Sequence, residues 1–168
     1  MRSKKVIFVS HCILNQNARA IGREKAAGAI RELVELLSEA GVGIVQIPCP
    51  QMEFGNRAIG RKAREKNTLD TKKYRDSCKK LSSHILKQIE SYLGKNYRVV
   101  GVLGVEFSPS CGVHQISNGS RHVPGKGIFF EEFDNEMRKK RFQVPVIGVN
   151  LNNMFSTVEK LQSLLECS

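Results

Sequence analysis

Three cysteines, Cys12, Cys49 and Cys111, each follow a short apolar run and stand in a polar or proline-containing turn. Free cysteine is usually buried as a small hydrophobic residue, so a thiol in such a turn favours a chemical role over a packing role. Thiolates are soft ligands that bind iron–sulfur clusters, zinc or copper(I). The other two cysteines differ, because Cys78 lies on the apolar stripe of a predicted helix and Cys167 lies at the C-terminus. We interpret those two as structural.

The number and spacing of the three cysteines limit which kind of metal centre they can hold. A closed zinc site uses four ligands, typically in tight Cys-x-x-Cys pairs, which this sequence lacks. An electron-transfer [4Fe–4S] cluster usually has a cysteine on every iron. Three thiolates leave one iron open, and an open iron can act as a Lewis acid or bind a substrate atom. Taken singly, each cysteine is better explained as the end of a strand. Taken together, the three favour a metal site with a catalytic role.

The elements that must position these thiols alternate between strand and helix. The predicted strands are 4–10, 43–47, 97–105 and 144–149, and the predicted helices are 24–40, 71–94, 129–141 and 157–166. Such alternation predicts a single α/β domain over residues 1–168, a three-layer α/β/α fold with a flavodoxin-like or Rossmann-like parallel sheet of about four to five strands. Loops at the carboxyl ends of parallel strands gather at one edge, so the three thiols are expected to converge.

Two irregular regions adjoin the cysteines. The stretch 106–127 is the longest predicted loop, and a loop of that length in a compact domain is usually functional. The sequence Arg-Ala-Ile-Gly-Arg occurs twice, at 19–23 and at 57–61, each time after a strand-end cysteine. Coincidence is the simpler explanation of so short a match. If the repeat is real, two basic loops flank the same rim.

Three blocks of the sequence resemble the thiouracil desulfurase family, DUF523, and more narrowly its TudS-related desulfidase branch. The blocks are SHCILN at 10–15, PCP at 48–50 and SPSCG at 108–112, the last being the most specific. The resemblance covers nearly the whole chain. It implies a [4Fe–4S] cluster held by Cys12, Cys49 and Cys111. It also implies that the fourth iron captures the sulfur of a thiocarbonyl such as 2-thiouracil, which leaves a carbonyl and releases sulfide. Gln51 stands where the family tends to have the glutamate of a Cys-Pro-Glu block.

Hydrolysis of a C=S bond needs a base that activates water. Glu53 and Glu106 are the candidates, since each lies close to a ligand cysteine in the sequence, although either can equally be a solvated loop acid. Ser108, which we also count as catalytic, and Ser110 are candidates for hydrogen bonds to a substrate oxygen or a cluster sulfide. Stabilisation of the turn explains both serines as simply.

Further polar residues are candidates for substrate contact. The histidines flank ligand cysteines and titrate near neutrality, which suits proton shuttles. The asparagines follow the fourth strand and could read a pyrimidine edge, although asparagine is also a common helix cap. The arginines could bind a phosphate, and solvated surface charge is their alternative explanation. The residues are His11, His114, Asn150, Asn153, Arg19 and Arg57.

The composition is strongly basic, with a formal net charge of +11 and a pI near 9.7. Such a charge attracts an anionic partner, for example a nucleotide, a tRNA or an acidic protein. The absence of tryptophan weakens the case for a base-stacking platform. The odd number of cysteines, with no signal-peptide pattern and no membrane-length apolar run, predicts a reducing cytoplasm.

The sequence therefore predicts an enzyme, a desulfidase or hydrolase that acts on the C=S bond of a thiolated pyrimidine, a related sulfur compound or a thiolated nucleotide. It is expected to act away from membranes, and we also consider a homodimer. Two other functions stay open. One is a non-catalytic carrier of zinc or an iron–sulfur cluster. The other is a tRNA-binding protein that acts on thiolated nucleosides.

Overall fold

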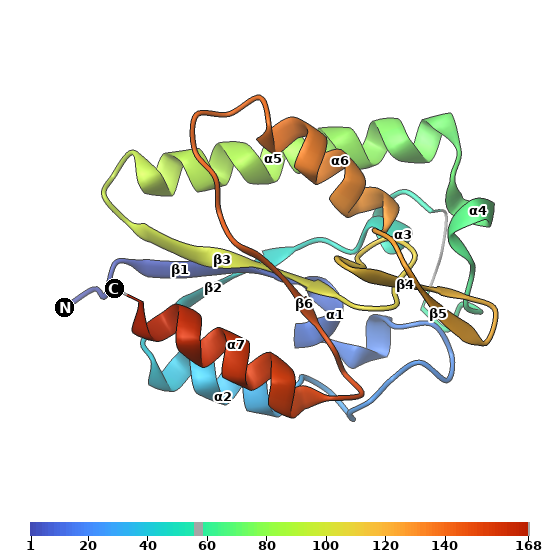
Figure 1. Cartoon of the computed structure of the whole chain (residues 1–168), viewed down its shortest axis with the longest axis horizontal. Coiled ribbons are helices and arrows are strands. Elements are labelled where there is room, and N and C mark those ends of the chain that lie inside the picture. Colours follow the sequence, from blue (N-terminus) through green and yellow to red (C-terminus); the bar gives the residue numbers. More distant parts are fainter. Residues whose placement is uncertain (56–58, 168) are drawn as a thin grey trace.

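A parallel sheet forms the centre of the computed structural model, which describes residues 1–55 and 59–167. Within these residues the sheet has four strands, which lie side by side in the order β2 (Gly43–Ile47), β1 (Lys5–Ser10), β3 (Arg98–Val105) and β6 (Val146–Val149). Helices α5 (Lys72–Leu93) and α6 (Ile128–Met137) cover one face. Helices α2 (Arg31–Glu39) and α7 (Met154–Glu166) cover the other (Figure 1). The predicted three-layer α/β/α fold is confirmed.

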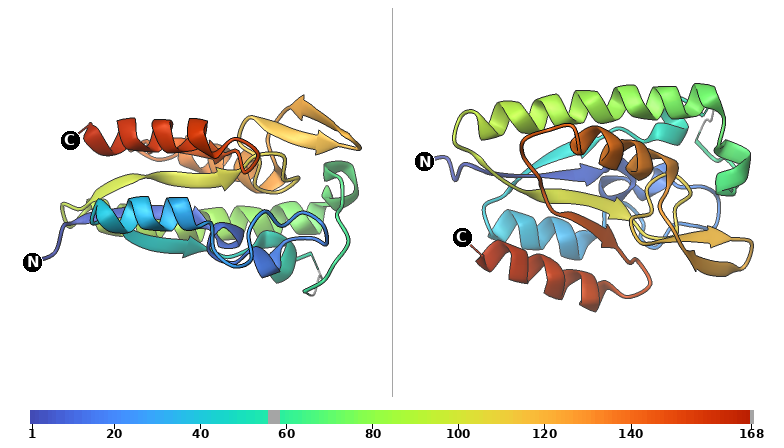
Figure 2. Two further views of the ribbon diagram at one scale, coloured as in Figure 1. Left: turned by 90° about the horizontal axis from the view of Figure 1, so that it is seen from below. Right: turned by 45° about the horizontal axis from the view of Figure 1, so that its top comes forward.

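Shorter elements surround the carboxyl end of the sheet. They are α1 (His11–Leu14), the 3₁₀ turn η1 (Gln16–Ala18), α3 (Pro50–Glu53), α4 (Lys66–Leu69) and the antiparallel pair β4 (Gln115–Asn118) and β5 (Arg121–Pro124). Figure 2 shows the β4–β5 hairpin at the end of the sheet opposite the two termini. The loops that carry the three predicted ligands therefore lie far from the chain ends.

Burial explains why the longest runs form strands and helices where they do. Every residue of β3 after Arg98 is buried, as expected for a central parallel strand covered on both faces. The buried stripe of α5 includes Tyr74, Cys78 and Ile85, and the Thr71 hydroxyl caps the helix by accepting from the Tyr74 N–H at 3.2 Å. The predicted apolar stripe that carries Cys78 is confirmed.

The strand order determines where a ligand site can form. The chain passes from β1 outward to β2, then returns across β1 to build β3 and β6 on its other side. The direction of winding reverses between β1 and β3, which is the switch point where open α/β sheets bind their ligands. Cys12 follows β1 and Cys111 follows β3, so two of the three thiols flank this point.

Some predicted boundaries were wrong, and tertiary contacts explain why. The helix predicted at 24–40 begins only at Arg31, because the preceding segment bonds to the turn after β1: Ile30 N–H donates to Ile13 O at 2.8 Å. The stretch 106–127, predicted to be irregular, contains the β4–β5 hairpin. Its two-residue turn consists of Gly119 and Ser120, and the φ of +63° at Gly119 is of the kind that favours glycine in tight hairpin turns.

In the part of the chain that the structure describes, none of the helices combines the length and the apolarity needed to cross a bilayer.

Candidate functional site

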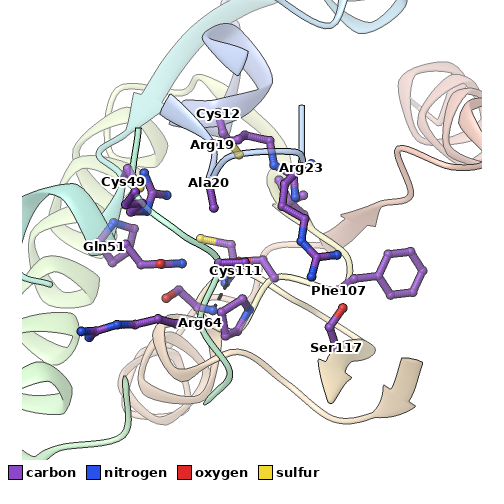
Figure 3. Close-up of a pocket in the computed structure, with 17 residues that line it drawn as sticks. Cys12, Arg19, Ala20, Arg23, Cys49, Gln51, Arg64, Phe107, Cys111 and Ser117 are labelled. Carbon is purple, nitrogen blue, oxygen red and sulfur yellow. Dashed lines mark hydrogen bonds between the residues drawn. The ribbon is translucent and has the colours of Figure 1, made fainter. Parts of the chain in front are cut away.

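One cavity at the carboxyl end of the sheet is lined by Cys12, Cys49 and Cys111 together. Each thiol comes from a different element. Cys12 lies in α1 directly after β1, Cys49 is the residue before α3, and Cys111 lies in the loop after β3. Figure 3 shows the three side chains around one part of the cavity, with Phe107 and Ser117 at its other side. The predicted convergence of the three thiols in one cavity is therefore what the structure shows.

The turn that carries Cys111 is held by hydrogen bonds from its own motif. The Ser108 hydroxyl accepts from the N–H groups of Ser110, at 3.3 Å, and Cys111, at 3.0 Å. The Val105 N–H donates to Cys111 O at 2.8 Å, which ties the turn to the end of β3. The Ser-Pro-Ser-Cys-Gly block thus fixes the main chain around the thiol.

Two glycines let neighbouring backbone approach this turn closely. A Cβ at Gly127 would lie 2.2 Å from the carbonyl carbon of Ser110, and one at Gly112 would lie 2.5 Å from Gln115 O. The two glycines also bond to each other, Gly127 N–H donating to Gly112 O at 2.9 Å. The glycine of the motif is therefore required by close packing.

Helix α5 supports the same turn from the side. The hydroxyls of Tyr74 and Ser110 lie 2.7 Å apart, with residue exposures of 4% and 1%. On the other side, the Ser10 hydroxyl at the end of β1 donates to Leu103 O at 2.8 Å. Buried polar groups of this kind fix a single conformation, because each would lose a hydrogen bond if the turn moved.

Burial favours the protonated form of two of the thiols, Cys12 and Cys111. Burial raises the pKa of Cys12 to about 11, an effect that the positive charges of Arg19 and Arg61 partly oppose. Burial also raises the pKa of Cys111 well above its ordinary value, and the neighbouring Cys12 and Cys49 raise it further. A buried thiol loses its proton when a bound metal ion stabilises the thiolate. Metal binding at these thiols would therefore release protons.

The charged residues among the described lining are all cationic. Four arginines line the cavity, and none of its described lining residues is Asp or Glu; the arginines are Arg19, Arg23, Arg61 and Arg64. Figure 3 shows three of them, Arg19, Arg23 and Arg64, around the labelled thiols. A cavity lined by charges of one sign attracts ligands of the other sign.

The structure brings some of the predicted residues to this cavity. Ser108, Ser110 and Arg19 line it along with the three cysteines. Arg57 lies outside the described residues. Glu53 does not line the cavity and is exposed at the end of α3.

Glu106 does not line the cavity either, and its carboxylate has structural partners. It accepts from the N–H groups of Val113 at 2.7 Å and His114 at 3.0 Å, and its second oxygen lies 3.3 Å from Nδ1 of the His114 ring. Glu106 is nearly buried and packs against Gly148, where a Cβ would meet it at 2.3 Å. The geometry therefore supports a role in holding the loop after the SPSCG block, and gives no support to Glu106 as a base in the cysteine cavity.

The remaining predicted contacts lie outside the cysteine cavity. His114 and Asn150 line a second cavity with Glu106, beside α7. Asn153 caps α7 by accepting from the Ser156 N–H at 3.3 Å, which is the alternative that the sequence left open. The His11 ring bonds through Nδ1 to the side chain of Gln46. None of these four side chains lines the cavity of the three thiols.

Sequence reasoning missed Arg23, Arg61 and Arg64 as lining residues. The repeat Arg-Ala-Ile-Gly-Arg was a signal for two of them, since it ends at Arg23 in one copy and at Arg61 in the other. It also missed Phe107, which lines the cavity with a φ of +72° and stacks on His122 with ring centroids 3.7 Å apart. Two main-chain hydrogen bonds to β4 hold this unusual backbone conformation.

Ligation of a metal by the three cysteines stays a prediction. Within residues 1–55 and 59–167, no group of three or more His, Cys, Asp or Glu side chains is arranged to hold a metal ion. What the structure shows is the shared cavity and the electrostatic influence of the thiols on one another.

Comparison with known proteins places the chain in a family. It is 36% identical over 166 residues to the uncharacterized protein MJ0003 of Methanocaldococcus jannaschii, covering 96% of this chain and 99% of that protein. The chain belongs to the family of MJ0003. No protein-family model matches it.

A solved structure shares the fold. The [4Fe–4S]-dependent thiouracil desulfidase TudS matches over 95% of this chain and 99% of its own, with a TM-score of 0.55 and 19% sequence identity. The fold that the thiouracil desulfurase resemblance implies is therefore confirmed over nearly the whole chain.

Proposed function

We propose that this protein is a desulfidase that binds a [4Fe–4S] cluster through Cys12, Cys49 and Cys111 and removes sulfur, as sulfide, from a thiocarbonyl compound. The shared cavity carries the proposal. Thiols from three separate strand ends line it, in a fold that the chain shares with a [4Fe–4S]-dependent thiouracil desulfidase. One domain over residues 1–168, a cytoplasmic location, a homodimer and contact with tRNA stay predictions.

The chemistry of the lining fits such a cluster. Thiolates are the ligands that iron–sulfur clusters prefer, and three of them leave one iron without a protein ligand. The cluster and its thiolates are negatively charged, and the four lining arginines offset that charge. When bound, the group would supply an iron with an open coordination position that acts as a Lewis acid toward the substrate sulfur.

The chain's own residues hold and orient the substrate. The Ser108 hydroxyl accepts from two main-chain N–H groups, so its own proton remains available for donation to a substrate atom. Ser110 shares its hydroxyl hydrogen bond with Tyr74 and holds the turn. Proton transfer is assigned to neither Glu53 nor Glu106, because neither lines the cavity.

The charge of the lining supports an anionic substrate. Four guanidinium groups with no lining carboxylate favour a thiolated nucleotide, such as 4-thio-UMP, over a neutral free base such as 2-thiouracil. A thiolated pyrimidine is the part of the substrate that both have in common.

The first experiment measures the cluster. Anaerobic reconstitution should give about four irons and four labile sulfides per chain, with a broad absorption near 400 nm. Cys12→Ser, Cys49→Ser and Cys111→Ser should each lose most of this content. Cys167→Ser is the matched control, because its thiol is exposed after α7 and does not line the cavity. Stoichiometric zinc without labile sulfide would refute the proposal.

The second experiment measures turnover. Sulfide released from 4-thio-UMP should exceed the amount of enzyme many times over, and Arg23→Gln should reduce kcat/KM for 4-thio-UMP more than for 2-thiouracil. Equal losses for both substrates would contradict the preference for an anion.

A second candidate function is a carrier of the cluster without turnover. The absence of Asp and Glu among the described lining residues favours it, because no carboxylate there can activate water. A carrier would release no more sulfide than the protein itself contains, and would pass its cluster to an apoprotein acceptor.

A further inference from the structure

The first copy of Arg-Ala-Ile-Gly-Arg, 19–23, contacts the described part of the second copy, 59–61, at the rim of the cysteine cavity. The Ile21 N–H of the first copy donates to Arg61 O of the second at 2.9 Å. The glycines of the two copies adopt matching left-handed conformations, with φ of +76° at Gly22 and +80° at Gly60. The isoleucines before them are both exposed, Ile21 by 65% and Ile59 by 60%. The repeat therefore corresponds to a pair of contacting turns.

This pairing fixes the guanidinium of Arg61. Its Nη1 donates to Ala18 O, next to the first copy, while its main-chain carbonyl accepts from Ile21. The side chain is thus held at both ends by the neighbouring turn. A guanidinium fixed in this way has lost most of its conformational freedom, and so binds an acceptor at little further entropic cost.

One donor of this fixed guanidinium has no acceptor. The Nε atom of Arg61 is buried and has no hydrogen-bond partner among the described residues. A buried donor without a partner is costly, and more so when it is charged. Arg61 lines the cysteine cavity, where no described Asp or Glu is available to accept. The missing acceptor is therefore expected to be whatever the cavity binds.

Arg61 is the less exposed of the two equivalent arginines. It lines the cavity together with Cys12, and its Nη1 bonds to Ala18 O, on the segment that follows Cys12. Arg23, the equivalent residue of the first copy, also lines the cavity but is exposed, whereas Arg61 is half-buried.

We propose that Arg61 is a positioning residue whose Nε–H would be donated to an anionic sulfur of the cluster that Cys12, Cys49 and Cys111 would hold, either a cluster sulfide or a hydrosulfide bound to the cluster. The proposal rests on the proposed function. A fixed positive charge beside the cluster stabilises its reduced, more negative state, and its hydrogen bond retains the sulfide. The two contacting turns hold this donor in position.

The test on the reconstituted protein uses two matched substitutions. Arg61→Gln should move the midpoint potential of the cluster to a more negative value in an EPR-monitored titration. In the presence of an iron chelator, Arg61→Gln should also release labile sulfide roughly 10-fold faster than wild type. Arg31→Gln removes an equal charge from exposed helix α2, outside the cavity, and should change neither quantity. The proposal is overturned if Arg61→Gln matches wild type in both, or if Arg31→Gln changes them equally.

A second measurement needs no cluster and separates the two proposals. In the reduced, metal-free full-length chain, Cys12 is alkylated in parallel with iodoacetate and with iodoacetamide. The ratio of the two rates reports attraction of an anion, because the fraction of thiolate cancels. Arg61→Gln should lower this ratio several-fold, and Arg31→Gln should leave it near the wild-type value.

If the wild-type chain holds no cluster, the proposed function fails while the ratio still decides the role of Arg61. An unchanged ratio in Arg61→Gln, with or without a cluster, rejects Arg61 as the anion donor. Added hydrosulfide distinguishes the two acceptors in the holoprotein. If wild type and Arg61→Gln differ in midpoint potential only when hydrosulfide has been added, the acceptor is bound hydrosulfide. If they differ without added hydrosulfide, the acceptor is a cluster sulfide.

Discussion

Replacing Tyr74 with phenylalanine should destabilise the turn that carries Cys111. The hydroxyls of Tyr74 and Ser110 lie 2.7 Å apart in a place where both residues are almost fully buried. Tyr74→Phe removes one hydroxyl and leaves the other without that partner. The expected loss in the free energy of unfolding is about 1–3 kcal/mol, the cost of an unsatisfied buried hydroxyl. Ser110→Ala should cost a similar amount, because it leaves the tyrosine hydroxyl unpaired.

The double variant gives the sharper test. Removing both hydroxyls leaves no unsatisfied group, so Tyr74→Phe with Ser110→Ala should cost less than the sum of the single changes. The difference should be on the order of 1 kcal/mol. Urea unfolding followed by circular dichroism, under reducing conditions at neutral pH, gives the midpoint and slope from which each free energy is obtained.

Tyr97→Phe is the matched control, because its hydroxyl bonds to none of the described residues. It should change the free energy of unfolding by less than about 0.5 kcal/mol. The reasoning fails if Tyr74→Phe is as mild as Tyr97→Phe, or if the two single changes add without coupling.

Three further predictions concern packing, pH and thiol reactivity. Gly127→Ala should lower the free energy of unfolding by about 3 kcal/mol, because the added Cβ would meet the backbone of Ser110. Gly28→Ala is the control, because a Cβ there would meet no other atom within 4 Å. An equal loss of stability in both variants would contradict this reasoning. Arg75 lowers the pKa of Asp70, so the stability contributed by that carboxylate is present above about pH 4 and lost as the pH falls through the depressed pKa. Asp70→Asn should therefore lower the melting temperature slightly at neutral pH and not in strong acid. The partly exposed ion pair of Asp70 with Arg75 should contribute less than about 1 kcal/mol. A difference in melting temperature that does not depend on pH would exclude the ion pair as its cause. Burial raises the pKa of Cys78 to about 12, so iodoacetamide should label it only after unfolding, and rapid labelling of the native chain would show that this face of α5 opens.

Local pattern was sufficient for the elements whose burial is uniform. The continuous apolar run at 97–105 predicted β3 (Arg98–Val105) almost to the residue, because a central strand is apolar on both faces. Periodicity alone was insufficient where a segment bonds to a distant one. The residues before Arg31 carry a helical pattern, yet their main chain pairs with the turn after β1. Propensity is a weak preference that such contacts override.

The three thiols were predictable because parallel strands impose one direction on all their carboxyl ends. The sequence shows that Cys12, Cys49 and Cys111 follow three strands, and the geometry of βαβ units then brings them to one edge. The direction of a loop side chain has no such constraint. Glu106 stands five residues before Cys111, yet its carboxylate turns toward the loop at Val113 and His114.

The sequence by itself thus determined the layered α/β fold and the three cysteines as the residues to examine, since residue type and position after a strand are local properties. Only the tertiary structure decided what surrounds them. The four lining arginines come from two loops that are distant in the sequence, and hydrogen bonds between these loops fix Arg61 in the lining of the cavity. Such long-range pairing depends on the folded chain, where its entropic cost is offset by the packing of the whole domain.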